Sequence, residues 1–414
     1  MPPSPLTADL VIVGAGPAGT AAAITAARSG RRVSVIDKAI FPRDKFCGDG
    51  LTTGALRLLD DLGLDPGAIP SWQQVDDATI SSPSGRTVTF PLPRGDGMYA
   101  VVAERRELDA AMVDLARSSG ATIHEGSAVT AVRSDADRVV VTADGLGDIT
   151  APYAIAADGM WSPVRKLLGL ATPGYLGDWH AFRQYFHNVE GQQPNQLHVW
   201  FEPDVLPGYI WSFPLPDHRA NVGFGIVRGD SIATSEMRSM WADILERPAI
   251  RAVLGPDAEP EHPPRAWPIP ARVGKVPLAA GRALVVGDAA AVSDPMTGEG
   301  IGQALVTGIR AAEAVATAGD ADPARAAAVY ESAVRRELVV DHRLAEVLGR
   351  VLRSPRGARG AVRVSGLTPW SRRHFARWLF EDYPRAAVAT PRRWHRGMFT
   401  GAGAFRGTGR PGSQ

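Results

Sequence analysis

The chain has 414 residues, a formal net charge of +1, and 45% hydrophobic and 21% charged residues. These values allow two or three domains with sizeable cores, and they exclude a disordered or fibrous protein. The lone cysteine, Cys47, cannot form an intramolecular disulfide, and the sequence shows neither a secretory signal nor an apolar run of about 18 residues, so we expect a cytoplasmic protein without a membrane-spanning helix.

Helices and strands alternate along the first 160 residues. Buried strands are expected over 9–13, 32–37, 122–124, 139–143 and 153–157, and helices over 18–29 and around Leu108, Met112 and Leu115. Such alternation predicts a mostly parallel sheet that is covered by helices.

Residues 175–275 have a different pattern, because short alternating segments indicate an antiparallel sheet. These segments are 196–201, 210–213 and 221–226. A buried strand over 283–286 and a long helix over 300–315 are expected next, and the chain after about residue 327 reads as helical with arginines on its polar faces.

A glycine-rich turn follows the first strand and opens the first helix. Gly14, Gly16 and Gly19 complete a G-x-G-x-x-G pattern that includes Ala18, and Asp37 ends the next strand. In this context the pattern predicts a dinucleotide site, with the pyrophosphate at the helix N-terminus and Asp37 on a ribose hydroxyl pair. The pattern alone does not separate NAD from FAD.

A second motif favours FAD. The segment 281–301 places Asp288 after a strand and continues to Gly300 and Ile301, and it resembles the second FAD motif of the flavoprotein group that includes aromatic hydroxylases, halogenases and geranylgeranyl reductases. The resemblance implies that Asp288 binds the ribityl chain and that the amides of Gly300 and Ile301 face the flavin pyrimidine. A helix N-terminus at that place would stabilise an anionic reduced flavin.

Three further positions match the same group. By resemblance, Arg105 contacts the cofactor, the backbone at Val129 contacts the adenine, and Asp158 belongs to a shared D-G motif. Alternatives remain for two of them, since Arg105 could pair with a helix carboxylate and Asp158 could cap a turn.

The fold class follows from these patterns. We predict an α/β protein in which a Rossmann-type FAD-binding domain is discontinuous, over 1–174 and 276–326. An antiparallel-sheet substrate domain is expected as an insertion over 175–275, and a helical, arginine-rich C-terminal region over 327–414.

Two stretches resemble the geranylgeranyl reductase family in particular. Residues 41–50 resemble its signature, which implies that Cys47, Gly48 and Asp49 lie at the flavin, where Cys47 could sense the cofactor position or donate a proton. The alternative for Cys47 is a small buried hydrophobe. Residues 207–214 match the family's Y-x-W-x-F-P motif.

That motif carries three aromatic side chains at alternate positions, namely Tyr209, Trp211 and Phe213. On a strand they point to one face and could line a slot for a flat apolar chain. An ordinary aromatic sheet core is the alternative.

The resemblance implies an FAD-dependent reductase that transfers hydride from reduced flavin N5 to carbon–carbon double bonds of a polyprenyl, geranylgeranyl-type lipid or diphosphate. A transient electron donor, NAD(P)H or a reduced carrier protein, is expected, because the sequence has no second G-x-G-x-x-G. The alternatives are an FAD-dependent monooxygenase of an aromatic or polyketide-like molecule and a non-catalytic flavin-binding protein. No metal site is expected.

Charge is concentrated at the C-terminal end. Residues 351–414 hold thirteen arginines, no lysine and two acidic residues, a balance of +11 that leaves about −10 for the first 350 residues. Aromatic residues lie between these arginines. We expect a peripheral contact of residues 355–414 with an anionic membrane, at its inner face, rather than with nucleic acid; a solvated helical face packed on the enzyme is the alternative.

Overall fold

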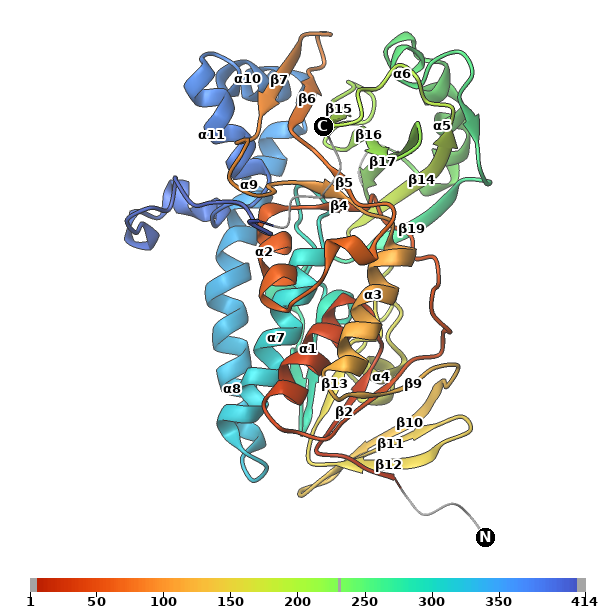
Figure 1. Ribbon diagram of the computed structural model, residues 1–414, viewed down its shortest axis with the longest axis vertical. Helices are drawn as coiled ribbons and strands as arrows, with labels where there is room; N and C mark the ends of the chain where they lie inside the picture. Colours follow the sequence, from red (N-terminus) through yellow and green to blue (C-terminus); the bar gives the residue numbers. More distant parts are fainter. Residues whose placement is uncertain (1–5, 230–231, 408–414) are drawn as a thin grey trace.

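The computed structural model describes residues 6–229 and 232–407. Figure 1 shows a parallel sheet with its helices in one half of the molecule, a larger mixed sheet in the other half, and the C-terminal helices beside both. The α/β fold class predicted from the sequence is confirmed, with a Rossmann-type domain, further sheets and a helical C-terminal region.

The central sheet has six strands in the order β20-β21-β13-β2-β3-β9. Its strands are β2 (Leu10–Val13), β3 (Val33–Ile36), β9 (Thr122–His124), β13 (Ala154–Ala156), β20 (Ala279–Ala280) and β21 (Ala283–Val285). All neighbours are parallel except β20 and β21. The strands β2 and β3 are buried at every position, as expected for a parallel sheet covered on both faces.

Small residues allow the helices of this domain to pack closely. Helix α1 (Pro17–Arg28) is rich in alanine, and it packs against α7 (Ile301–Ala318). At Gly308 of α7, a Cβ atom would lie 2.0 Å from the backbone oxygen of Ala18. The helices α3 (Arg105–Ser118) and α8 (Pro323–Val334) pack against α1 and α7 respectively.

Two smaller sheets extend this domain. One has the order β1-β12-β11-β10, and its strands are β1 (Leu6–Thr7), β10 (Val129–Ser134), β11 (Val139–Ala143) and β12 (Gly147–Ala151). The other contains β4 (Gly50–Leu51), β8 (Val101–Val102) and β5 (Gln73–Gln74). Two short helices, α2 (Thr53–Asp61) and α4 (Pro163–Leu167), complete it.

The other half of the molecule is built on an eight-stranded sheet. Its strands are β6 (Asp77–Ser81), β7 (Thr87–Pro91), β14 (Trp179–His187), β15 (Gln196–Trp200), β16 (Tyr209–Leu215), β17 (Arg219–Val227), β18 (Glu259–Pro260) and β19 (Arg265–Ile269). Six of them come from the expected insertion at 175–275, whereas β6 and β7 come from the long excursion after β3. The pairing of β15 with β6 is parallel, so the sheet is mixed rather than purely antiparallel.

Helices α5 (Met237–Glu246) and α6 (Pro248–Leu254) cover one face of this sheet. Alternate residues of β16 and β17, such as Ile210 and Phe224, pack there with Trp241 in a common core. The opposite face of β16 is therefore left for other contacts, because neighbouring side chains of a strand point to opposite faces.

The C-terminal region forms α9 (Val340–Leu352), α10 (Pro355–Ser365) and α11 (Pro369–Leu379), after a π-helical segment (Arg335–Val339) that follows α8. Short helices at Arg385–Ala389 and Pro391–Arg393 follow. Helix α11 packs on β7, with the rings of Phe90 and Phe375 4.7 Å apart. Residues 408–414 of the region 355–414 lie outside the described residues.

Buried ion pairs attach this region to the rest of the protein. Arg385, which is 2% exposed, pairs with Asp294 at 2.6 Å, and Asp382 pairs with Arg57 at 2.5 Å and with Arg377. At least three residues of the C-terminal region, Arg377, Asp382 and Arg385, therefore stabilise the fold. Within residues 6–229 and 232–407, no helix has the length and apolarity needed to cross a lipid bilayer.

The contact between α1 and α7 can be tested by substituting Gly308 with alanine. The added methyl group would overlap the backbone of Ala18, so we expect a loss of about 1–3 kcal/mol in the free energy of unfolding, measured by denaturant titration. Gly349 in α9 has open space around its Cβ position, and Gly349→Ala should be neutral or stabilising. Equal effects of the two substitutions would contradict this packing.

Candidate cofactor and substrate site

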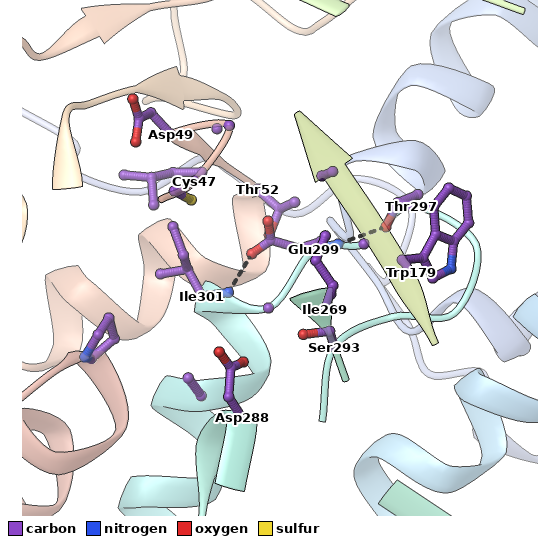
Figure 2. A pocket seen from close by; sticks show the side chains of 18 of the residues that line it. Cys47, Asp49, Thr52, Trp179, Ile269, Asp288, Ser293, Thr297, Glu299 and Ile301 are labelled. Carbon is purple, nitrogen blue, oxygen red and sulfur yellow. Dashed lines mark hydrogen bonds between the residues drawn. The ribbon is translucent and has the colours of Figure 1, made fainter. Parts of the chain in front are cut away.

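A cavity of about 1300 Å³ extends between the two halves of the molecule. It is lined by the glycine turn after β2, the loop that contains Cys47, the segment around Asp288, the aromatic face of β16 and the C-terminal helices. Figure 2 shows the part of its wall where the loop with Cys47 and Asp49 faces the segment from Asp288 to Ile301. Its lining is mainly apolar.

The three fingerprint glycines have different surroundings. A Cβ atom at Gly14, whose φ is +102°, would lie 2.3 Å from the oxygen of Ala157, and one at Gly19 would lie 1.8 Å from the oxygen of Gly14. These two glycines are required by the protein backbone itself. The nearest atom to a Cβ at Gly16 is 3.8 Å away, so space is left beside the N-terminus of α1, where a pyrophosphate fits. Ala18 lines the same space.

Asp37 and Val129 line another part of the cavity. The carboxylate of Asp37 accepts hydrogen bonds from the amides of Ala15 at 2.7 Å and Ala39 at 2.8 Å, so it organises the fingerprint turn. The amide of Ser127 donates to the oxygen of Asp37, which brings the start of β10 to the end of β3. The two residues that the sequence analysis expects at the ribose and the adenine therefore lie on the same part of the cavity wall.

Asp288 lies just beyond β21, and its side chain lines the cavity below the start of α7 (Figure 2). Within the described parts of the chain, its carboxylate makes no hydrogen bond or ion pair and is free to accept one from a ligand. Gly300 is the residue before α7, and a Cβ there would lie 2.7 Å from Ser293 Oγ. A larger residue would not fit at this turn.

Glu299 is a residue whose role the sequence did not predict. Its Oε1 accepts hydrogen bonds from the amides of Ile301 at 2.9 Å and Gly302 at 3.1 Å, so the amide expected to face the flavin is bonded to this carboxylate (Figure 2). Burial, followed by repulsion from Glu381, raises the pKa of Glu299 to about 7. Only the folded structure reveals that neighbour, 82 residues further along the chain.

The loop with Cys47, Gly48 and Asp49 lies against β17. Burial is the largest cause that raises the pKa of Cys47 to about 11, so its thiol stays protonated at neutral pH. Asp49 is fully buried and accepts hydrogen bonds from Tyr185 Oη at 2.5 Å and Asn221 Nδ2 at 2.7 Å. Burial raises the pKa of Asp49 to about 6. Asp49 therefore positions the loop.

Arg105 and Asp158 line the cavity, but each also has a structural partner. Arg105 donates to both oxygens of Asp109, at 2.7 and 2.8 Å. Asp158 accepts hydrogen bonds from Ser162 Oγ at 2.6 Å and from the amide of Val164 at 2.9 Å, at the start of α4. The alternatives noted from the sequence, a helix carboxylate for Arg105 and a cap for Asp158, are both present.

Lys45 is a second lining residue that sequence reasoning missed. Its ammonium group lies 3.7 Å from the ring centroid of Trp267, and burial lowers the pKa of Lys45 to about 8. The signal in the sequence was the position of Lys45, two residues before Cys47 in the segment 41–50 that resembles the reductase signature.

The three aromatic residues of β16 all line the cavity. The ring centroids of Tyr209 and Trp211 are 5.9 Å apart, and those of Trp211 and Phe213 are 6.2 Å apart. Trp211 Nε1 donates to Asn221 Oδ1 at 3.0 Å, and a Cβ on Gly223 would lie 2.4 Å from the Trp211 ring. The glycine on the neighbouring strand thus makes room for this indole.

One protein family matches most of the chain. The FAD binding domain family matches residues 7–333. The chain belongs to this family. The protein is an FAD-dependent oxidoreductase, and the free carboxylate of Asp288 and the space at Gly16 fit this cofactor.

Two relatives with similar sequences are named as reductases. The chain is 37% identical over 326 residues to the menaquinone reductase of Mycobacterium tuberculosis. This match covers 74% of this chain and 76% of that protein. It is 31% identical over 323 residues to the digeranylgeranylglycerophospholipid reductase of Methanothrix thermoacetophila, which covers 75% of this chain and 78% of that protein. The resemblance to geranylgeranyl reductases is confirmed.

Two solved structures have the same fold as this chain. A geranylgeranyl bacteriochlorophyll reductase-like protein from Thermoplasma acidophilum has a TM-score of 0.79 and 24% identity, and covers 94% of this chain and 99% of that chain. A halogenase in complex with FAD has a TM-score of 0.67 and 17% identity, and covers 93% and 84%.

Gly16→Val and Asp288→Ala should each yield folded protein without bound FAD. The first fills the space for the pyrophosphate, and the second removes a free acceptor from the cavity wall. Flavin absorbance per mole of purified protein is the measurement, with circular dichroism as the control for folding. Full flavin occupancy in both variants would refute the cofactor roles of these residues.

Glu299→Gln should make stability less dependent on pH. Because the pKa of Glu299 is raised in the fold, the folded protein binds more protons than the unfolded chain between pH 4.5 and 7, and stability falls as pH rises through this range. Glutamine keeps an acceptor oxygen without the charge. Compared with wild-type apoprotein, the variant should unfold similarly near pH 5 and be more stable by roughly 1–3 kcal/mol at pH 8.5.

The measurement is denaturant unfolding of both apoproteins at a series of pH values. A difference in stability that stays constant from pH 5 to pH 8.5 would contradict the raised pKa.

Proposed function

We propose that this oxidoreductase reduces carbon–carbon double bonds in a polyprenyl substrate. The observation that carries the proposal is the continuity of one cavity, which runs from the space at Gly16 and Asp288 to the aromatic face of β16. An apolar slot that begins at a flavin site suits a long apolar chain whose reacting carbons must approach the flavin.

The names of the relatives support this substrate class. Menaquinone carries a polyprenyl chain on a quinone ring, and digeranylgeranylglycerophospholipid carries two such chains on a lipid headgroup. The shared chemistry is an isolated alkene in an isoprenoid chain.

When bound in the space at Gly16 and Asp288, FAD would supply a hydride equivalent for one alkene carbon, and the neighbouring carbon would take a proton from the protein. The rings of Tyr209, Trp211 and Phe213 hold the chain and exclude water from it. The Cys47 thiol, which stays protonated, is the proposed proton donor and is replenished from solvent. NAD(P)H or a reduced carrier protein would restore the two electrons used per bond.

The reaction can be tested by anaerobic incubation of dithionite-reduced enzyme with geranylgeranyl diphosphate or menaquinone, followed by mass spectrometry. We expect the product mass to rise by two hydrogens per bond. Reduction of a quinone ring reverses in air, whereas reduction of the chain persists, so samples are analysed after exposure to air. A product with one added oxygen would indicate a monooxygenase instead, and an unchanged mass would reject the proposal.

Trp211→Ala should keep bound FAD but lose most alkene reduction, because a wall of the slot is removed. The substitution also deletes the hydrogen bond to Asn221, so Trp211→Phe, which keeps an aromatic ring without that bond, is the matched control. We expect turnover to fall more than tenfold in the alanine variant and to be largely retained in the phenylalanine variant. A folded, FAD-loaded alanine variant with normal turnover would exclude the slot.

A further inference from the structure

Exposed apolar side chains are concentrated in one part of the chain. Twelve large hydrophobic residues are exposed among those that the structure describes, and seven of them lie within residues 347–394. They are Val347, Val351, Val364, Leu367, Trp370, Val388 and Trp394. Single exposed hydrophobic residues are ordinary, but a concentration beside a cavity indicates a contact surface.

Four of these residues also line the cavity, and we call them the rim: Val351, Trp370, Val388 and Trp394. Residues that are about half exposed and also line a cavity must lie at its opening. Trp370 is 65% exposed and Trp394 53% exposed. The cavity therefore has an opening to the surface between α9, α11 and the short helices after α11; Trp161, which is 43% exposed and also lines the cavity, marks another.

An apolar path leads inward from the rim. On α9, Leu344, Leu348 and Val351 recur at helical spacing along the cavity, and on α11 Trp370 is followed by Trp378 two turns later. The indole of Trp394 donates to the oxygen of Ala387 at 2.7 Å, so its polar atom is satisfied and its ring remains for apolar contact.

The C-terminal stretch that carries the rim has an excess of positive charge. Each acidic residue in the described part of 340–407 is already engaged: Asp341 with Arg393, Glu346 with Lys275, Glu381 with Arg385, and Asp382 with Arg57 and Arg377. Within the described part of 340–407, the exposed arginines that make no ion pair with a described residue are Arg343, Arg350, Arg356, Arg359, Arg363, Arg373, Arg392 and Arg396. On α10, three of them lie opposite the packed face formed by Ala358 and Val362.

We propose that the rim is a port that docks on an anionic lipid bilayer, through which a polyprenyl chain passes from the membrane into the cavity. The proposal rests on the proposed function for its substrate. Exposed tryptophans suit the headgroup region, and unpaired arginines suit anionic lipid, each contributing about 1 kcal/mol near the surface. A chain that enters there is never exposed to water on its way to the aromatic slot.

Co-sedimentation of the FAD-loaded full-length protein with vesicles tests the docking. Vesicles of phosphatidylcholine alone and with phosphatidylglycerol are compared, and binding should need the anionic lipid and weaken as salt rises. Point variants are used, because deletion of the C-terminal helices would remove a wall of the cavity.

Two variants remove the port's chemistry. Arg356→Gln/Arg359→Gln/Arg363→Gln should weaken partitioning roughly 100-fold, since three charges are lost. Trp370→Ser/Trp394→Ser should weaken it as well. The matched controls carry the same changes elsewhere on the surface, and both should bind like the wild type; they are Arg133→Gln/Arg138→Gln/Arg325→Gln and Leu167→Ser/Leu176→Ser.

Activity separates this proposal from the proposed function. The arginine variant should reduce a short, soluble prenyl diphosphate at the wild-type rate but reduce a vesicle-embedded polyprenyl lipid much more slowly. If wild-type protein ignores anionic vesicles at low salt, or if the port variants bind like their controls, the port is wrong, and the surface fits an acidic protein partner instead. Vesicle binding without reduction of any alkene would overturn the proposed function alone.

Discussion

A buried hydrogen-bonded junction around Asn221 of β17 fixes the loop with Cys47 to the aromatic face of β16. Its amide group donates to Asp49 at 2.7 Å and to the oxygen of Cys47 at 2.9 Å, and its oxygen accepts from Trp211 at 3.0 Å. One side chain thus holds both the loop expected at the flavin and the central ring of the aromatic slot. Because unsatisfied polar groups in such a place are costly, the geometry between the two is closely defined.

The outer wall of the cavity depends on a second set of buried contacts. Arg385 reaches Asp294 beneath the turn that leads into α7, and Asp382 binds Arg57 on α2. These pairs draw the C-terminal helices onto the domain that binds FAD. Removing one partner of such a pair would leave an uncompensated buried charge. The C-terminal wall of the cavity and the FAD-binding domain are therefore expected to unfold together.

Much of the α/β core was predictable, because its signals are local. The apolar runs at 9–13 and 139–143, the glycine turn and the alanine-rich first helix each follow from short-range pattern and packing. The joining of β6 and β7 to the substrate sheet was not, since it depends on pairing between segments more than 100 residues apart. The raised pKa of Glu299 was equally out of reach, because it comes from burial beside Glu381.

Composition alone does not show which arginines of the C-terminal region are buried and which are exposed. Their number is plain in the sequence, but only the fold separates Arg377 and Arg385, which are buried in ion pairs, from those that remain exposed around the rim. The same holds for the aromatic residues, since Phe375 packs on Phe90 whereas Trp370 is exposed. The charged and aromatic residues of this region predicted a contact surface. Their burial in the structure shows that some of them form the cavity wall, whereas others remain exposed for contact.

The central claim is that one cavity holds both FAD and an isoprenoid chain. The most direct measurement is an experimental structure of the FAD-loaded enzyme with a saturated, unreactive polyprenyl analogue. We expect density for the flavin ring beside Cys47 and Gly48, and for the chain along Tyr209, Trp211 and Phe213 toward the rim. A chain bound outside this cavity, or a flavin ring far from the aromatic face, would contradict it.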